Sequence, residues 1–339
     1  MTATDTRIEA VPTNVITGFL GVGKTSAILH LLKSKPDNER WAVLVNEFGE
    51  IGVDGSLFEG QHNEAGNVFI REVPGGCMCC AAGLPMQIAL NQLLSLAKPD
   101  RLLIEPTGLG HPIEVLEVLT AEYYFNVLAI QKIITLVDAR NLADTRYTDH
   151  ATFNQQIAIA DIVVGNKQDL YLPEDKAQLE TYAKSKALSE VDVIFTEHGQ
   201  LPISALEGST GARVGSHQHH HHSNKSAEQV SLADAPLPES GYLKAVNQGE
   251  GFNSIGWRFD ASKTFDRQAL FLFLSGVFAE RLKAVFITEI GVFGYNLTSD
   301  ALTEVELDDC VESRIEIIAS EISDQWEEQL LACIVAGGQ

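Results

Sequence analysis

Basic residues are scarce in this chain. Its 339 residues include 24 Lys and Arg against 46 Asp and Glu, which gives a formal net charge of −22. Nucleic acids and anionic membranes attract proteins through positive charge that neutralises phosphates, so neither is expected as a partner. Long apolar runs are also missing: no stretch is long enough to span a bilayer, and the first ten residues show no secretory signal.

Cysteine is too scarce and too unevenly spaced for a disulfide framework. The chain has five cysteines, and three of them, Cys77, Cys79 and Cys80, fall within four residues. We therefore expect a reduced, cytoplasmic protein. Clustered thiols favour a soft metal ion or a redox partner. The C-x-C-C spacing differs from the C-x-x-C of redox pairs, which favours the metal.

Apolar segments predict an α/β domain over residues 1–210. Several segments of helical period, such as 84–96 and 113–120, lie between short apolar runs. This alternation predicts a mostly parallel sheet flanked by helices. The runs with the length of buried parallel strands are 13–17, 41–45, 101–104, 132–137 and 162–164.

The composition changes after this domain. A stretch rich in Gly, Ser, Ala and Pro that contains SHQHHHH predicts a flexible, His-rich linker over 211–245. Ordered patterning returns over 246–339 and predicts a smaller α+β domain. Its expected strands are 254–260, 284–289 and 313–319, and its expected helices are 267–280 and 321–332.

The sequence GFLGVGKT at Gly18–Thr25 has the spacing of a phosphate-binding loop, and it lies between a predicted strand and a predicted helix. In such a loop the backbone N–H groups point at phosphate oxygens. Lys24 would reach the β- and γ-phosphates, and Thr25 would bind Mg²⁺ through its hydroxyl. The candidate phosphate-binding residues are Gly18, Phe19, Leu20, Gly21, Val22, Gly23, Lys24, Thr25 and Ser26.

A second motif predicts the base. Asn166, Lys167 and Asp169, in NKQD, follow the predicted strand 162–164. A carboxylate at Asp169 can accept hydrogen bonds from both N–H donors on the Watson–Crick edge of guanine, and adenine offers no such pair. The sequence therefore favours GTP over ATP.

A third motif, EPTG at Glu105–Gly108, ends the predicted strand 101–104. It resembles the magnesium- and γ-phosphate-sensing element of P-loop enzymes. Glu105 would bind Mg²⁺ through water or position the attacking water, and Gly108 would sense the γ-phosphate through its N–H. The alternative is that Glu105 only caps the following helix. Lys24 and Glu105 are the candidate catalytic residues.

Cys77, Cys79 and Cys80 favour Zn²⁺, Co²⁺ or Cu⁺ over Mg²⁺, because thiolates are soft ligands. Zinc prefers four ligands, so three thiols leave the site open. Glu47 is a candidate fourth ligand, whereas Glu50 is expected to make γ-phosphate or surface contacts. An auxiliary metal-binding role is considered for His217, His219, His220, His221 and His222. Cys310 and Cys333 are interpreted as small core residues.

The motifs GFLGVGKT, NEFGEIGVD, GGCMCC, EPTGLGHP and NKQD, in this order, resemble the CobW-type metallochaperone P-loop GTPases, relatives of UreG and HypB. The residues within these motifs are most similar to the bacterial zinc-binding branch typified by YeiR. The resemblance implies a P-loop GTPase domain and a CobW-type C-terminal domain. It implies hydrolysis of GTP to GDP and phosphate with Mg²⁺, and transfer of zinc, the bound cargo, from the C-x-C-C motif to a client metalloprotein.

The leading hypothesis is a slow GTPase in which γ-phosphate contacts order the loop 46–54 and thereby alter the thiol site. A nucleotide- or metal-dependent dimer is also considered. One alternative keeps the enzyme and exchanges zinc for cobalt, for cobalamin synthesis. Another is a zinc buffer whose nucleotide site is vestigial.

Overall fold

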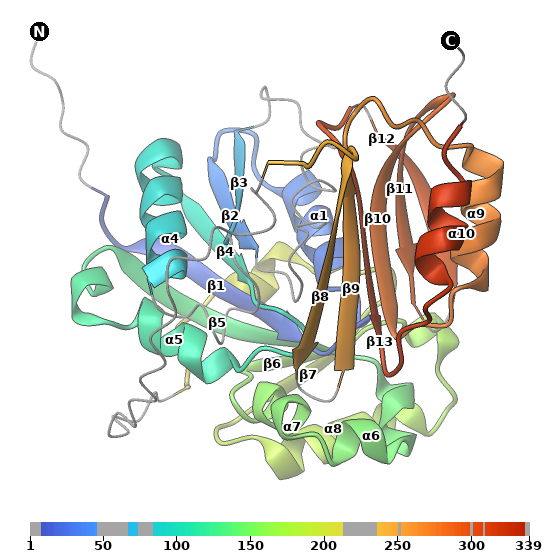
Figure 1. Ribbon diagram of the computed structural model, residues 1–339. Helices are drawn as coiled ribbons and strands as arrows, with labels where there is room; N and C mark the ends of the chain where they lie inside the picture. The colour runs from blue at the N-terminus through green and yellow to red at the C-terminus, as the bar shows by residue number, and fades with distance from the viewer. Residues whose placement is uncertain are drawn as a thin grey trace, which may run out of the picture. The chain divides into compact units, whose positions relative to one another are not determined.

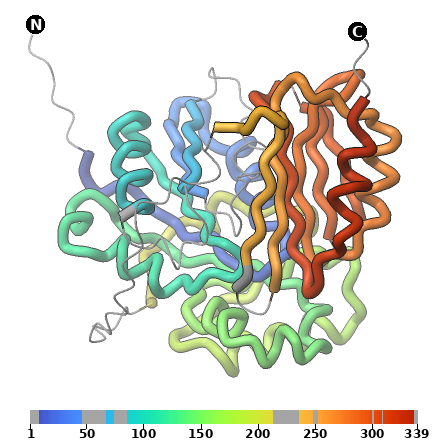
Figure 2. The backbone as a smooth tube through the Cα atoms, in the orientation of Figure 1, coloured from blue at the N-terminus to red at the C-terminus, as the bar shows by residue number. Residues whose placement is uncertain are grey.

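The computed structural model describes residues 8–45, 67–73, 84–212, 236–249, 252–298, 301–307 and 309–335. The chain divides into two compact units; the described residues up to 212 belong to the first, and those from 236 onward belong to the second. Figure 2 traces the first unit from blue to yellow-green and the second in orange and red. Each unit has its own sheet and its own apolar core.

A seven-stranded sheet forms the centre of the first unit (Figure 1). All neighbouring strands pair in parallel, in the order β3-β2-β4-β1-β5-β6-β7. The strands are β1 (Val11–Gly18), β2 (Trp41–Val45), β3 (Val68–Glu72), β4 (Arg101–Glu105), β5 (Leu128–Val137), β6 (Ile162–Gly165) and β7 (Asp192–Phe195). The order reverses beside β1, so the loops after β1, β4, β5 and β6 meet at one edge, where parallel sheets bind ligands.

Helices cover this sheet, which explains why β2 is buried at all five of its residues. Helices α4 (Leu84–Ala97) and α5 (Pro112–Leu119) share one apolar cluster with β1, β2 and β4. Helices α1 (Lys24–Ser34) and α7 (Ala151–Ala158) contact β1, and α8 (Asp175–Lys186) contacts β6. Short helical segments fill the connections: η2 (Glu122–Tyr124), η3 (Ala139–Ala143), α6 (Thr145–Thr148), η4 (Gln168–Leu170) and η5 (Ile203–Leu206).

The second unit contains a six-stranded antiparallel sheet in the order β12-β11-β10-β13-β9-β8. Helices α9 (Arg267–Gly276) and α10 (Trp326–Ala332) lie together beside it (Figure 1), and they share an apolar cluster with residues such as Trp257 and Phe286. The strands are β8 (Tyr242–Gly249), β9 (Phe252–Phe259), β10 (Arg281–Thr288), β11 (Gly291–Leu297), β12 (Leu302–Leu307) and β13 (Ser313–Ala319).

The predicted fold class is confirmed: a parallel sheet flanked by helices, followed by a smaller α+β unit. Five strands were not predicted. Strands β3 and β7 are edge strands with partly exposed sequences, and β12, an edge strand of the other sheet, has a mixed sequence with one threonine and two glutamates. Strand β11 contains two glycines, which weaken a strand pattern. Strand β8 begins at Tyr242, inside the predicted linker 211–245, most of which lies outside the described residues.

Candidate functional site

The loop from Gly18 to Lys24 connects the end of β1 directly to α1. Gly18 and Gly23 adopt positive φ angles of 142° and 97°, a region that favours glycine. A side chain would also not fit at either of these two positions. A Cβ on Gly18 would lie 2.4 Å from the carbonyl oxygen of Leu136, and one on Gly23 would lie 2.5 Å from Nδ2 of Asn166. The loop therefore requires glycine at positions 18 and 23, and helix α1 begins directly after it.

Two side chains of the loop are fixed in its interior. The ammonium of Lys24, which is 6% exposed, donates to the carbonyl oxygens of Gly18 at 2.9 Å and Phe19 at 3.1 Å. The hydroxyl of Thr25 donates to the carboxylate of Glu105, at 3.1 Å from Oε1 and 3.5 Å from Oε2. Glu105 is 3% exposed at the end of β4, the strand beside β1. The parallel register thus brings together Thr25 and Glu105, which are 80 residues apart.

The turn after Glu105 packs against the loop. A Cβ on Gly108 would lie 2.9 Å from Cδ2 of Leu20 and 3.0 Å from its backbone nitrogen. Gly110 donates its N–H to the carbonyl of Thr107 at 3.1 Å, which closes the turn. The side-chain amide of Gln156, in α7, donates to the carbonyl of Gly108 at 3.0 Å. The EPTG motif predicted roles for Glu105 and Gly108, but Gln156 belongs to no motif and was not predicted.

Asn166 lies at the end of β6 and connects two loops. Its Nδ2 donates to the carbonyl of Val22 at 2.8 Å, and its Oδ1 accepts the N–H of Gly199 at 3.1 Å. A Cβ on Gly199 would lie 2.7 Å from the backbone nitrogen of Ala27, so the loop after β7 packs against α1. Asn166 is 2% exposed and therefore braces the phosphate loop. Asp169, by contrast, is exposed.

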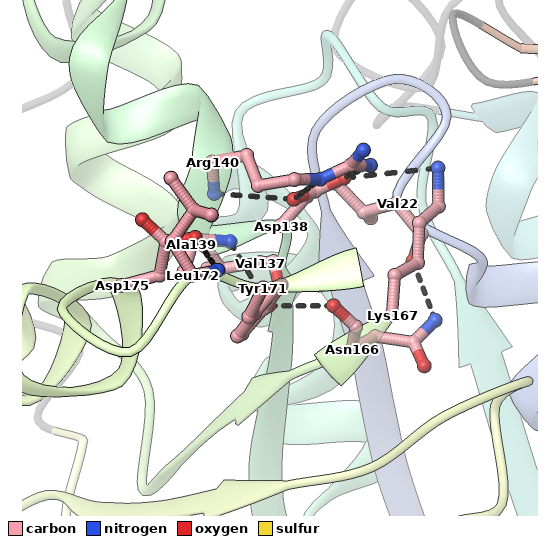
Figure 3. A network of polar contacts seen from close by, with 10 residues as sticks. All are labelled: Val22, Val137, Asp138, Ala139, Arg140, Asn166, Lys167, Tyr171, Leu172 and Asp175. Carbon is pink, nitrogen blue, oxygen red and sulfur yellow. Dashed lines mark hydrogen bonds and ion pairs between the residues drawn. The ribbon is translucent and has the colours of Figure 1, made fainter. Parts of the chain in front are cut away.

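A polar network follows Asn166 (Figure 3). Arg140 binds the carboxylate of Asp138 with two nitrogens, Nε at 2.9 Å and a terminal nitrogen at 2.5 Å. The ammonium of Lys167 lies 3.8 Å from the same carboxylate, and Lys167 has the left-handed φ of 63°. Figure 3 shows both cations directed at Asp138, which is 3% exposed. The NKQD lysine is thereby held beside the end of β5.

Tyr171 forms hydrogen bonds to the segments that follow β5 and β6. Its hydroxyl donates to the carbonyl of Asn166 at 2.5 Å and accepts the N–H of Ala139 at 2.9 Å. Burial raises the pKa of this phenol well above its usual range, so the hydroxyl stays a donor at physiological pH. Asp138, Arg140 and Tyr171 belong to no motif that the sequence offers. The sequence offered one signal for Asp138, which directly follows the predicted strand that ends at Val137. Ligands bind at the carboxyl ends of the strands in a parallel sheet, so a polar residue there is a candidate site residue.

Several predicted residues lie outside the described residues: the thiols Cys77, Cys79 and Cys80, the acid Glu47, and His217, His219, His220, His221 and His222. The loop 46–54 lies outside them too. Within the described ranges, no three His, Cys, Asp or Glu side chains are grouped as a metal site. In the same ranges, no helix has the length and apolar character needed to cross a membrane.

The cysteines of the second unit are free thiols. Cys333 is 5% exposed, and its thiol lies 3.3 Å from the carbonyl of Gln329 in α10. Cys310 is half-buried. Burial raises the pKa of each thiol to about 11. Both are therefore protonated near neutral pH, which is the state of a packing residue.

Comparison with known proteins matches residues 12–195 to the family model of the CobW/HypB/UreG nucleotide-binding domain. The zinc chaperone YeiR of Escherichia coli (strain K12) is 40% identical over 322 residues, which cover 92% of this chain and 94% of YeiR. The zinc chaperone YjiA of the same organism is 30% identical over 210 residues, covering 60% of this chain and 63% of YjiA.

Among solved structures, the Zn(II)-bound YjiA GTPase from E. coli aligns with 96% of this chain and 99% of its own, at 17% identity and a TM-score of 0.43. The relation of this chain to known proteins is therefore taken from the family model over residues 12–195 and from the 40% sequence identity to YeiR, and not from this structural alignment.

Proposed function

The chain belongs to the CobW/HypB/UreG family, and from this membership and the site geometry we propose that it is a zinc-binding metallochaperone GTPase. It hydrolyses GTP to GDP and phosphate and transfers zinc from Cys77, Cys79 and Cys80 to a client metalloprotein. The zinc part of the proposal is supported by the 40% identity to a zinc chaperone over 92% of the chain. The cytoplasmic location expected from the sequence stays a prediction.

The nucleotide part is carried by one observation, the 3.1 Å contact between the hydroxyl of Thr25 and the carboxylate of Glu105. Mg²⁺ prefers hard oxygen ligands and is usually bound by one or two protein groups together with phosphates. A hydroxyl and a carboxylate at the phosphate loop fit that requirement. Thr25 and Glu105 would hold the ion, which neutralises charge on the phosphates when bound.

Lys24 is proposed to act in hydrolysis together with Glu105. Its ammonium is held 2.9 Å from the carbonyl of Gly18, at the base of the phosphate loop. A cation in this position stabilises the charge that develops on the β- and γ-phosphates as their bond breaks. Because Lys24 is 6% exposed, water screens that interaction weakly. Gly108, packed against Leu20, would donate its N–H to the γ-phosphate.

Base recognition is proposed for Asp169 together with Asn166 and Lys167. The exposed carboxylate of Asp169 is available for the two N–H donors of guanine. Asn166 supports the phosphate loop through Val22, and Lys167 is held beside Asp138. The loop residues Phe19, Leu20, Gly21, Val22, Gly23 and Ser26 complete the proposed nucleotide site.

The zinc site is proposed at Cys77, Cys79 and Cys80, with Glu47 as the candidate fourth ligand. Thiolates bind zinc and cobalt alike, so the ligand set does not separate these two ions. An open position would allow a client's ligand to enter before the metal leaves. The His-rich segment, His217 to His222, would raise the local metal concentration. The client and a nucleotide- or metal-dependent dimer belong to the same proposal.

Steady-state phosphate release tests this function. With GTP and Mg²⁺ we expect slow turnover, weaker turnover with ATP, and loss of turnover in Lys24→Ala. Lys33→Ala is the matched control, because Lys33 is an exposed lysine of the same helix. No phosphate release from the wild type, with or without zinc, would instead support a zinc buffer with a vestigial nucleotide site. Tighter binding of Co²⁺ than Zn²⁺ in a parallel titration would favour the cobalt alternative.

A further inference from the structure

Gln156 is a buried polar residue outside every nucleotide-binding motif of the sequence. It lies in α7 and is 1% exposed. Its side-chain nitrogen is 3.0 Å from the carbonyl oxygen of Gly108 and 3.5 Å from that of Gly110. Both carbonyls belong to the turn that follows Glu105. Hydrogen bonds are directional, so a carbonyl that accepts from a buried amide has a restricted orientation. The peptide planes of this turn are therefore restricted by Gln156.

The helix that carries Gln156 is itself anchored. The hydroxyl of Thr135, in β5, donates to the backbone carbonyl of Gln156 at 2.7 Å. At the other end of α7, the ring of Phe153 lies 5.9 Å from the ring of Phe19, a residue of the phosphate loop. Phe19 also contacts the rings of Tyr147 and His150. One short helix therefore contacts the phosphate loop through Phe19 and the turn after Glu105 through Gln156.

The turn is confined from two sides. Leu20 of the phosphate loop packs against Gly108, leaving no room for a Cβ, and Gln156 binds the carbonyl of the same residue. A rotation of the turn that moves the Gly108 N–H toward or away from a γ-phosphate must therefore change the hydrogen bond to Gln156. The N–H and the C=O of Gly108 lie in neighbouring peptide planes joined at its Cα. Leu20 crowds that Cα, which limits how far one plane can turn without the other.

We propose that Gln156 is a positioning residue for nucleotide discrimination: it orients the Gly108–Gly110 turn so that the turn responds to a nucleoside triphosphate and not to a diphosphate. This inference rests on the proposed GTPase function. It assigns to α7 the task of connecting the phosphate loop with the γ-phosphate-sensing turn. Gln156 acts through Gly108 and touches no reacting atom.

The test uses full-length Gln156→Met and Gln156→Glu, which keep the length of the side chain. The methionine has no donor, and the glutamate presents an oxygen where the amide donated. Three quantities are measured for each: kcat for GTP hydrolysis, the Kd for GDP, and the Kd for a non-hydrolysable GTP analogue. Gln155→Met is the matched control, since Gln155 is the neighbouring residue and its side chain bonds the ring of His111, the residue that follows the turn, at 3.1 Å rather than a carbonyl of the turn.

In both Gln156 variants we expect kcat and the affinity for the GTP analogue to fall by about 10-fold, within the range for a lost buried hydrogen bond. The Kd for GDP should stay within about 2-fold, because GDP has no γ-phosphate for the turn to contact. Gln155→Met should match the wild type in all three measurements. The ratio of GTP-analogue to GDP affinity is the readout that a purely structural role would leave unchanged.

Two results would overturn the inference. One is wild-type affinity for both nucleotides in both variants. The other is an equal loss of GDP and GTP-analogue binding in both variants, including through failure to fold, since Gln156 would then serve the fold as a whole. A wild type without GTP hydrolysis would contradict the proposed function separately, and the wild-type measurement in the same series distinguishes that case.

Discussion

The two units bury their polar side chains in different ways. In the first unit, Glu105 ends β4, Asn166 directly follows β6, and Lys24 begins α1; all three contact the segment Gly18–Thr25. In the second unit, Arg258 of β9 binds Glu312, the residue before β13, and Arg281 of β10 binds Glu316 of the neighbouring strand β13. Buried polar groups that converge on a loop indicate a site, whereas buried pairs along a sheet indicate support for the fold. Substitutions should separate these two cases.

The largest effect is expected for Lys24→Ala in the first unit. Hydrolysis should fall by about 100- to 1,000-fold, the usual cost of removing a donor that stabilises transition-state charge. The melting temperature should change far less than hydrolysis, because the hydrogen bonds of Lys24 to Gly18 and Phe19 lie within one short loop. Phosphate release and thermal unfolding, measured on the same preparation, check this. A Lys24→Ala variant with a lowered melting temperature and normal hydrolysis would show instead that Lys24 supports the fold.

Glu312→Ala should give the opposite pattern in the second unit. The change removes the carboxylate that accepts from Arg258 at 2.6 Å and from Arg314 at 2.7 Å, both buried or half-buried. Leaving a buried cation without its partner costs about 3 to 5 kcal/mol. Urea unfolding followed by circular dichroism measures that loss, and GTP hydrolysis by the folded fraction should be unchanged.

The control for this prediction is Lys244→Met. Lys244 pairs with Glu327 at 2.6 Å, but both side chains are about a third exposed. Solvent screens such a pair, so its loss should cost under about 1 kcal/mol. Equal destabilisation by Glu312→Ala and Lys244→Met would show that burial of the first pair does not matter.

Asp169→Asn should weaken GTP binding by about 10-fold or more, since one of two hydrogen bonds to guanine is lost and a donor faces a donor. Xanthosine triphosphate carries a carbonyl where guanine has its amine, so the variant should bind it more tightly than the wild type does. Fluorescence titration with both nucleotides measures the switch. Unchanged GTP affinity would remove Asp169 from the base site.

The smallest effect concerns the thiols of the second unit. A pKa raised from 9.0 to about 11 keeps Cys333 and Cys310 protonated at pH 8. A thiol reagent should therefore modify Cys77, Cys79 and Cys80 first, as mass spectrometry of the labelled peptides would show. The folded-state pKa lies above the unfolded one, so the stability from these thiols is complete below pH 9. It is lost as the pH rises towards about 11. Rapid labelling of Cys333 at pH 8 would contradict its packing role.

Sequence patterns predicted the first unit better than the second, for physical reasons. A phosphate loop needs glycines at fixed spacing and a lysine and threonine after them, so Gly18–Thr25 is visible in the sequence. Buried parallel strands such as β2 are continuous apolar runs. Edge strands such as β3 and β12 are half-exposed, and their mixed sequences resemble loops.

The supporting residues of the candidate site were beyond the reach of sequence patterns. Gln156, Asp138 and Tyr171 reach the site through helix packing and strand register, over separations of 48 residues from Gln156 to Gly108 and 34 from Tyr171 to Val137. For Gln156 and Tyr171, nothing in the neighbouring sequence distinguishes them from other glutamines and tyrosines. For Asp138, the one signal is that it follows the predicted strand that ends at Val137. Only the fold shows which of them face the nucleotide loops.

The measurement that tests the account most directly is a zinc titration of the full-length protein with a non-hydrolysable GTP analogue, with GDP, and without nucleotide. If the nucleotide site of the first unit controls the thiols, zinc affinity must differ between the GTP-analogue and GDP states, and the difference must vanish in Lys24→Ala. Equal zinc affinity in all three states of the wild type would contradict the coupling and leave a zinc-binding protein whose GTP site has another purpose.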